Sequence, residues 1–397
     1  MSRVGLVFAA AGARSTVTGL TGVLLGLYLA RLDLPPETVG LVLGLGLTGN
    51  ACGTALLAAR GDRMGTRPVL VAASLLSAAG LGVMAATGHP ALLGGAALLG
   101  MVNSMGRDRG VAQAVDQTLL ADWGGDAART RLFTRYTIVQ DLLGALGSLA
   151  AAAPAALIAA LALTPLAADR WVLRAAGAVS LVAAALYLRV PTGRSRQQAP
   201  VSLAPASRRR LKGLAALFAL DSLGGGLIAG SVLSYWFFRR FGLDGGALGP
   251  VFFAARMLNA LSYVAAEHLA RRIGLVRTMV FTHLPSSLLL LALPFMPTPG
   301  GAIALFLLRE ALVQMDVPAR QSYVAAVTLP GERAYAFGVT GVVRNVGWAF
   351  GPPLAGLAIG TYGLGAPLVI GAGLKALYDL ALFAGYRTVT PPEERGP

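Results

Sequence analysis

Two charged residues lie deep inside long apolar segments, where an ionised side chain is costly. Arg14 and Asp221 each follow the start of their segment by about ten residues, and Tyr28 and Tyr235 follow them at the same distance of 14 residues. A charge near the centre of a membrane helix costs roughly 3 kcal/mol on insertion scales, so it indicates a partner or a task. The repeated spacing suggests a duplicated membrane unit with a central polar site, which is typical of a transporter.

Other ionisable residues are expected at comparable depth, judged from the ~1.5 Å rise per helical residue. They are Asp141, Arg309, Glu310 and Arg344, with Arg107, Asp108 and Arg109 nearer to the cytoplasmic side. Asp116, Asp316 and Arg320 are expected close to the cytoplasmic surface.

Two interpretations of these charges stay open. Opposite charges can pair and fix the packing of helices, or a carboxylate can bind and release a proton as its partners change. An arginine stays protonated, so it can only hold a carboxylate or an anionic solute. Asp221 is the first candidate for proton coupling, followed by Glu310 and Asp141.

The composition is that of an all-α membrane protein. Of 397 residues, 55% are hydrophobic and 13% are charged, whereas soluble domains carry about 25% charge. Apolar runs long enough to cross ~30 Å of hydrocarbon predict twelve transmembrane helices. The predicted spans are 5–30, 38–59, 68–88, 91–119, 133–158, 171–189, 213–238, 247–269, 276–296, 301–327, 335–360 and 365–386. The first run is expected to be a retained helix rather than a signal peptide, because it is long and lacks a small-residue cleavage site.

The net charge is +15. The positions of the basic residues indicate membrane topology rather than a surface that binds nucleic acid. Most basic residues fall in alternate gaps between the predicted helices: Arg60, Arg63, Arg67, Arg129, Arg131, Arg194, Arg196, Arg208, Arg209, Arg210, Lys212, Arg271, Arg272, Arg277, Arg333 and Arg387. The opposite gaps hold Arg31, Arg170, Arg174, Arg239 and Arg240. By the positive-inside rule, both termini are cytoplasmic in a multi-pass protein of the inner or plasma membrane. The lipid bilayer is thus a partner, and nucleic acid is not expected.

The chain is predicted to consist of two six-helix bundles. The stretch 191–210 is rich in Pro, Ser and Arg and suits a flexible linker. This divides the chain into an N-terminal bundle 1–190, a cytoplasmic linker 191–212 and a C-terminal bundle 213–397. Residues 116–118 (Asp-Gln-Thr) match 320–322 (Arg-Gln-Ser) at an offset of 204. Two parallel six-helix halves are one way to build alternating access around a midplane site.

The loop 59–67, Ala-Arg-Gly-Asp-Arg-Met-Gly-Thr-Arg, resembles the loop signature of the major facilitator superfamily at Asp62, Arg63, Gly65 and Arg67. The sequence departs from that signature at Ala58 and Arg60, and a degenerate copy follows at 271–274. The resemblance covers essentially the whole chain and implies a fold of two pseudo-symmetric six-helix bundles.

The resemblance also implies two sites. In the family the loop is a cytoplasmic gate, in which Asp62 would pair with basic groups and a helix N-terminus of the other half. Because the first, fourth, seventh and tenth helices line the central cavity in this family, Arg14, Arg107, Asp108, Asp221, Arg309 and Glu310 would lie on the solute and proton pathway. The alternative for Arg63 and Arg67 is an ordinary role as positive-inside anchors.

Two glycine-rich stretches can each be interpreted in two ways. Residues 347–352 (Gly-Trp-Ala-Phe-Gly-Pro) resemble a signature that exporters of this superfamily carry in the fifth helix, but here it lies in the eleventh. It indicates export or simply close helix packing. The three glycines 224–226 could let the helix unwind beside a solute, or they could allow close packing.

No cofactor, metal site or enzymatic activity is expected. Cys52 is the only cysteine, and His89, His268 and His283 are scattered; His283 is interpreted as a satisfied polar residue of an outer helix. No phosphate-binding loop or nucleophile motif is present. The sequence therefore predicts a monomeric secondary transporter of a small molecule by alternating access, with proton-coupled efflux by antiport preferred. Proton-coupled uptake, facilitated transport of a charged metabolite, and a membrane sensor or scaffold are the alternatives.

Overall fold

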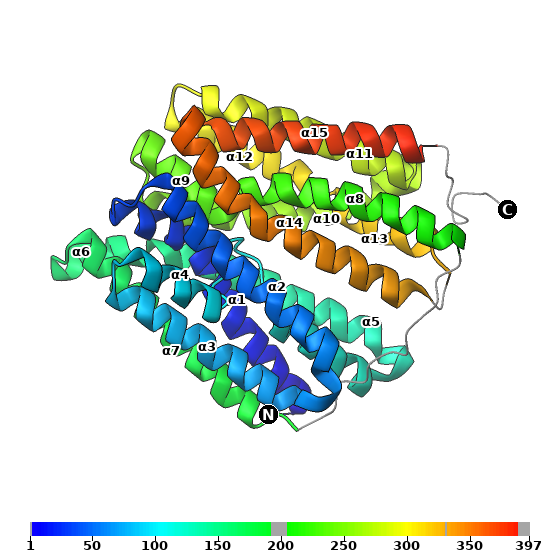
Figure 1. Ribbon diagram of the computed structural model, residues 1–397, viewed down its shortest axis with the longest axis horizontal. Helices are drawn as coiled ribbons and strands as arrows, with labels where there is room; N and C mark the ends of the chain where they lie inside the picture. Colours follow the sequence, from blue (N-terminus) through cyan, green and yellow to red (C-terminus); the bar gives the residue numbers. More distant parts are fainter. Residues whose placement is uncertain (1, 192–204, 330–331, 388–397) are drawn as a thin grey trace. The chain divides into compact units, whose positions relative to one another are not determined.

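The computed structural model describes residues 2–191, 205–329 and 332–387, and within these ranges the regular structure is helical, without strands. Figure 1 shows the helices in chain order. The helices are α1 (Arg3–Arg31), α2 (Pro36–Met64), α3 (Thr66–Ala86), α4 (Pro90–Leu99), α5 (Val111–Leu149), α6 (Ala153–Leu161), α7 (Pro165–Leu188), α8 (Pro205–Leu227), α9 (Gly230–Phe241), α10 (Gly245–Ile273), α11 (Leu275–Ala292), α12 (Pro299–Val313), α13 (Asp316–Ala326), α14 (Arg333–Tyr362) and α15 (Ala366–Tyr386). Short 3-10 turns, η1 (Ala150–Ala152) and η2 (Leu293–Phe295), follow α5 and α11. The predicted all-α class is confirmed.

Each of the twelve predicted spans corresponds to one helix or to consecutive helices. Within the described residues, nine helical stretches are long and apolar enough to cross a membrane. The fourth and tenth spans fall outside that set because each is interrupted: residues 100–110 separate α4 from α5, and Gln314 and Met315 separate α12 from α13. The eleventh span is continuous in α14, but its glycines, two prolines and Arg344 lower its mean hydropathy.

The element α5 contains two predicted spans. Tyr136 donates a hydrogen bond to Asp116 over 3.0 Å, although 20 residues of straight helix would separate them by about 30 Å. The chain must therefore reverse its direction between these two residues. The end of the fourth span and the fifth span are consequently neighbours.

The predicted seventh span is interrupted after its three glycines. Residues 224–226 remain helical at the end of α8, and the helix stops at Ile228 and Ala229 before α9 begins. Gly226 lies against another glycine, since a Cβ atom placed on it would be 2.8 Å from Gly351 Cα. Close packing and a break in the helix therefore both occur here.

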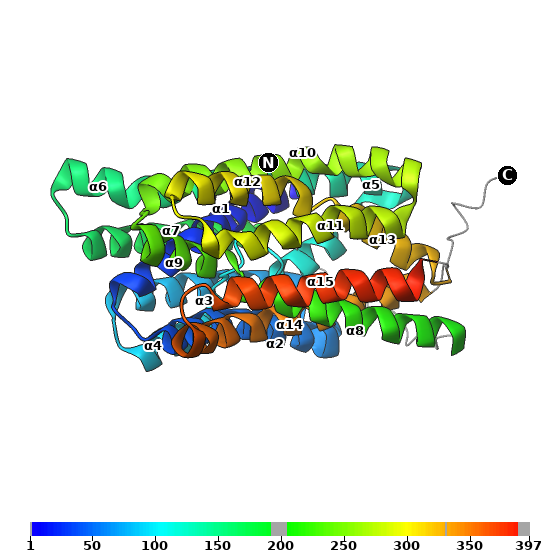
Figure 2. The same cartoon turned by 90° about the horizontal axis from the view of Figure 1, so that it is seen from above.

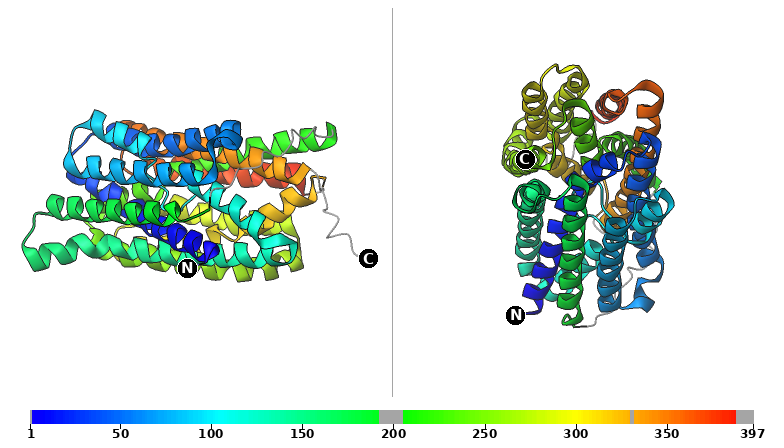
Figure 3. Two further views of the ribbon diagram at one scale, coloured as in Figure 1. Left: turned by 90° about the horizontal axis from the view of Figure 1, so that it is seen from below. Right: turned by 90° about the vertical axis from the view of Figure 1, so that its left-hand side faces the viewer.

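The described residues form two compact units. The first contains residues up to 191 together with 229–253 and 352–364, and the second contains 205–228, 254–351 and 365–387. In the first unit, α1 packs against α5, α7 and α9, and α3 packs against α7 (Figure 3). In the second unit, α15 packs against α8 and α11, and α11 also contacts α12 and α13 (Figure 2).

Large apolar side chains also cover the outside of these units. Leu261, Val264 and Phe350 are 69%, 74% and 61% exposed. Such exposure is costly in water but suits a surface that faces lipid. The folded units thus agree with the membrane class that the composition predicts.

Candidate functional site

Arg14 is the centre of a buried ionic cluster in the first unit. Its Nη2 atom lies 2.8 Å from Asp108 Oδ2 and 2.9 Å from Asp116 Oδ2. Asp108 also accepts a hydrogen bond of 3.2 Å from Gln140 Nε2. Three elements supply these groups: α1 carries the arginine, the irregular segment 100–110 carries Asp108, and α5 carries Asp116 and Gln140. One guanidinium is therefore shared by two carboxylates.

Asp116 is the most enclosed member of this cluster, with no exposed surface. It accepts hydrogen bonds from the hydroxyls of Tyr136 on α5 and Tyr187 on α7, at 3.0 Å and 2.8 Å. The guanidinium of Arg14 also stacks over the Tyr187 ring, 5.5 Å from its centroid. The expectation that Asp116 lies close to the cytoplasmic surface rests on a count of depth along an unbroken fourth helix. The interruption at 100–110 invalidates that count.

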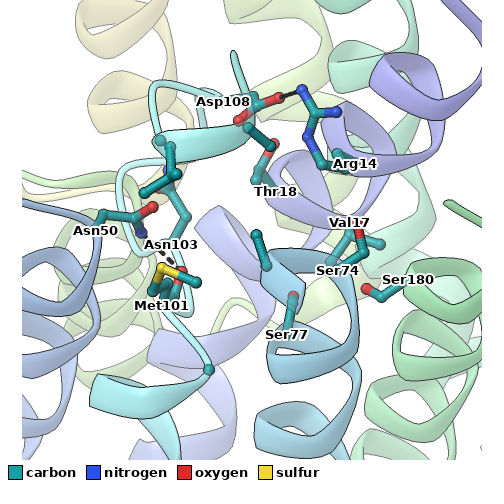
Figure 4. A pocket seen from close by; sticks show the side chains of 15 residues that line it. Arg14, Val17, Thr18, Asn50, Ser74, Ser77, Met101, Asn103, Asp108 and Ser180 are labelled. Carbon is teal, nitrogen blue, oxygen red and sulfur yellow. Dashed lines mark hydrogen bonds and ion pairs between the residues drawn. The ribbon is translucent and has the colours of Figure 1, made fainter. Parts of the chain in front are cut away.

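A cavity of about 60 Å³, lined by both polar and apolar groups, adjoins the arginine (Figure 4). Its polar lining comes from five parts of the first unit: Arg14, Thr18, Asn50, Ser74, Ser77, Asn103, Asp108 and Ser180. Figure 4 shows Asp108 and Arg14 joined at one end of it. Nε and Nη1 of Arg14 are buried and have no hydrogen-bond partner within the described residues. A cavity of this size and polarity can hold a few water molecules.

Asp221 has the opposite surroundings in the second unit. Its carboxylate lies 2.7 Å from Lys375 Nζ on α15, 3.5 Å from Arg320 Nη1 on α13 and 4.0 Å from Arg344 Nη2 on α14. Arg320 also pairs with Asp316 at 2.8 Å. Three cations therefore surround this carboxylate within ion-pair distance.

The network continues from Lys375 through His283 to Asp379. Lys375 Nζ is 3.3 Å from His283 Nε2, and His283 Nδ1 is 2.9 Å from both oxygens of Asp379. His283 is 2% exposed and Asp379 is fully buried. The expectation that His283 is satisfied holds, but its partners are charged groups of this network.

The remaining pathway candidates have varied surroundings. Arg309 contacts its chain neighbour Glu310, and Glu310 accepts a hydrogen bond of 3.0 Å from Asn259 on α10. Arg344 stacks on Trp348, 4.8 Å from the ring centroid. Asp141 is half-buried on α5, and no hydrogen bond or ion pair joins it to another described residue. Arg107 and Arg109, on either side of Asp108, both have interactions of their own.

The candidate gate has a defined turn at its centre. Gly65 joins α2 to α3 with φ of 70°, and Gly274 joins α10 to α11 with φ of 86°. Only glycine adopts this region readily, so the two turns share one geometry. Arg67 is exposed. The side chains of Asp62 and Arg63 lie outside the described part of the structure, so the gate stays a prediction.

Lys375 and Asp379 are the main residues that sequence reasoning missed. They are four residues apart in the last predicted span, so they lie on one face of a helix. Two opposite charges in that spacing are a recognisable signal within an apolar run. Among the residues that the structure describes, no three His, Cys, Asp or Glu side chains gather in a way that could hold a metal ion.

Comparisons of the sequence and the fold with known proteins agree on one family. The sequence model of the Major Facilitator Superfamily matches residues 6–315. The chain is similar to an uncharacterized membrane protein of Saccharomyces cerevisiae, with 23% identity over 416 residues, 96% of this chain and 93% of the yeast protein. Its fold is similar to the nucleoside transporter NupG, with a TM-score of 0.75 and 16% identity over 97% of this chain and 99% of that one. It is also similar to a D-xylose-proton symporter, with a TM-score of 0.73 and 16% identity over the full length of both chains.

Proposed function

Since the chain belongs to the major facilitator superfamily, we propose that it is a secondary transporter that exchanges protons for a small solute by alternating access, in the direction of export. The observation that carries this proposal is the sharing of Arg14 by Asp108 and Asp116. The proposed setting is the inner or plasma membrane, with both termini in the cytoplasm and the monomer as the working unit.

The charges of this cluster support proton coupling. One arginine offsets one carboxylate, and it cannot give up its own proton. The second carboxylate of the pair remains buried among the hydroxyls of Tyr136 and Tyr187, which stabilise it without adding positive charge. Two carboxylates that share one site favour the binding of one proton between them. The neighbouring cavity, which polar side chains help to line, provides room for the water that would deliver it.

The same cluster favours exchange over cotransport. A proton or a positively charged group of a solute can neutralise the second carboxylate, but both cannot do so together. Solute binding then releases the proton, and proton binding releases the solute. This competition gives antiport and favours a small organic cation as the solute.

The surroundings of Asp221 favour a structural role, in which it stays paired with cations, over the role of proton carrier. Lys375, Arg320 and Arg344 all lie within 4.0 Å of it, so removal of its charge would leave buried cations unpaired. Breaking a buried ion pair in this way costs about 3–5 kcal/mol. We therefore assign the exchangeable proton to Asp108 and Asp116 and an anchoring role to Asp221.

The test uses purified protein in liposomes that contain a pH dye. A pooled panel of drugs and metabolites is added under an imposed pH gradient, and compounds that move protons only in the presence of the protein are identified. We expect cationic compounds to drive proton flux opposite to their own movement. Flux in the same direction as the compound indicates symport, and thermal-shift binding without any flux indicates a uniporter or a sensor; either result would overturn the proposal of antiport.

A further inference from the structure

The two ring nitrogens of His283, in the second unit, have different neighbours. Nδ1 faces the carboxylate of Asp379 at 2.9 Å. Nε2 faces Lys375 Nζ at 3.3 Å and Asp221 Oδ1 at 3.6 Å. Lys375 Nζ itself bonds that same oxygen of Asp221 at 2.7 Å. The lysine and the histidine thus meet at one carboxylate oxygen.

These contacts define which ring nitrogen carries the proton. A lysine ammonium only donates hydrogen bonds, so Nε2 must accept from Lys375 and carries no hydrogen. Nδ1 faces a carboxylate, which only accepts when ionised, so Nδ1 carries the proton and donates it to Asp379. The arrangement therefore requires a neutral imidazole with its proton on Nδ1.

The neighbouring charges agree with a neutral ring. Three carboxylates and three cations make up the network: Asp221, Asp316, Asp379, Lys375, Arg320 and Arg344. These groups lie on α8, α13, α14 and α15, the last of which also presents the edge of the Tyr378 ring, 5.8 Å from the centroid of His283. On α12, Arg309 and Glu310 pair with each other. A charged His283 would add one unbalanced positive charge.

We propose that His283 is a second proton-binding site of this protein, neutral with its proton on Nδ1 in the arrangement described here, and able to take a further proton on Nε2 when Lys375 leaves Asp221. The lone pair of Nε2 accepts a proton from water, and the new N–H donates to Asp221 Oδ1. Lys375 keeps all its protons and must move away from Nε2, because an ammonium and a ring N–H are both donors and cannot face each other at 3.3 Å. Histidine is the side chain that ordinarily changes charge between pH 5 and 8.

The glycines of α8 lie directly against the Lys375 side chain. A Cβ atom on Gly224 would lie 3.1 Å from Lys375 Cγ, and one on Gly225 would lie 3.9 Å from Lys375 Nζ and 3.2 Å from Trp348 Nε1. The lysine side chain therefore passes over a bare stretch of helix.

The experiment is nitrogen NMR of histidine-labelled protein in nanodiscs. His89 and His268 are exposed, so H89Q and H268Q together leave His283 as the sole histidine. We expect a neutral ring at pH 7 with its hydrogen on Nδ1. Lys375→Met in that background should convert the ring to imidazolium at the same pH, because one cation is lost and Nε2 is free to donate to Asp221. Lys212→Met, at an exposed position of α8, is the matched control and should leave the signal unchanged.

The inference fails if the sole-histidine protein carries its hydrogen on Nε2, or if Lys375→Met leaves the ring neutral. Should Lys375→Met not fold, Asp221→Asn gives the opposite test: with one carboxylate fewer, the ring should stay neutral to lower pH than in the parent. Charging at the same pH as the parent would then overturn the proposal. These signals are read without any transported compound, so they are independent of the proposed antiport.

Discussion

Two of the buried clusters in the described residues differ in how their carboxylates are paired. In the first unit a single cation, Arg14, holds Asp108 and Asp116. In the second unit a single carboxylate, Asp221, is held by Lys375, Arg320 and Arg344. In the first cluster two carboxylates share one guanidinium, whereas in the second cluster one carboxylate has three cations within 4.0 Å. This difference is the reason to assign proton exchange to one cluster and anchoring to the other.

Removing the lysine should therefore cost stability. Lys375→Met leaves the buried carboxylate of Asp221 with weaker partners, and a broken buried pair costs about 3–5 kcal/mol. Thermal unfolding in detergent should show a large decrease in Tm for Lys375→Met. Lys212→Met, the same change at an exposed site, should shift Tm little. Equal effects of the two substitutions would show that the ion pair contributes nothing to stability.

At the scale of single residues, the sequence predicts that charged side chains lie within the membrane, but not which of them form ion pairs. Charged residues within apolar segments are conspicuous in the sequence, because burial of an unpaired charge is costly. This applies to Arg14, Asp108, Asp221 and Arg344. Their partners do not follow from that rule. Asp116 lies beyond an interruption that hydropathy does not reveal, and the contact of Lys375 with Asp221 joins residues 154 positions apart.

Interrupted helices place the charged residues. Segment 100–110 lets Asp108 reach Arg14, and the break at Gln314 and Met315 precedes Asp316 and Arg320. Broken helices in transporters expose backbone and polar groups at the centre of the membrane. Predicted spans 91–119 and 301–327 each contain an interruption, because an average over a long apolar window hides non-helical residues. The reversal within α5 was predicted as a gap between spans.

The contact of α8 with α14 gives a test of close packing. Gly226→Ala places a methyl group 2.8 Å from both Gly351 Cα and Trp348 O, so it should destabilise the second unit by about 1–3 kcal/mol, as overpacking does. Gly338→Ala on α14 meets nothing within 4 Å and should be neutral or slightly stabilising, because alanine favours helix. Thermal unfolding of the two variants tests this prediction. An unchanged Tm in Gly226→Ala would argue against tight packing of α8 on α14.

The linker gives a second prediction at the scale of elements. Residues 192–204 lie outside the described residues, while Pro205 already begins α8. Since the composition of this stretch offers little apolar surface to bury, its shortening should leave folding in detergent intact. Monodisperse elution of the shortened protein at the wild-type position would agree, and aggregation would show that the segment is structural.

At the scale of the whole molecule, the fold was readable from twelve apolar runs and the distribution of basic residues. The length of the runs follows from the thickness of the bilayer and the cost of exposed backbone in lipid, and the basic residues predict the orientation through the positive-inside rule. Identity of 16% with the transporters of similar fold leaves the solute undetermined, because the solute depends on a few side chains within a shared scaffold.

The expected topology can be tested directly. In a Cys52→Ser background, Lys212→Cys should react with a membrane-impermeant maleimide only in inverted vesicles, because the positive-inside rule places it in the cytoplasm. Arg240→Cys, exposed in the last turn of α9, should react only in right-side-out vesicles. Reaction of both from the same side would contradict the twelve-span arrangement.

The most direct test of the central claim compares Asp116→Asn with Asp221→Asn in dye-loaded liposomes, using compounds that drive proton flux through the wild type. Asparagine keeps the shape of Asp116 but cannot bind the proton, so we predict that this variant still binds the compounds in thermal shift and loses their proton flux. Asp221→Asn, where it folds, should retain flux with the pH dependence of the wild type. Unchanged flux in Asp116→Asn, or a loss confined to Asp221→Asn, would contradict the assignment of the exchanged proton to the Arg14 cluster.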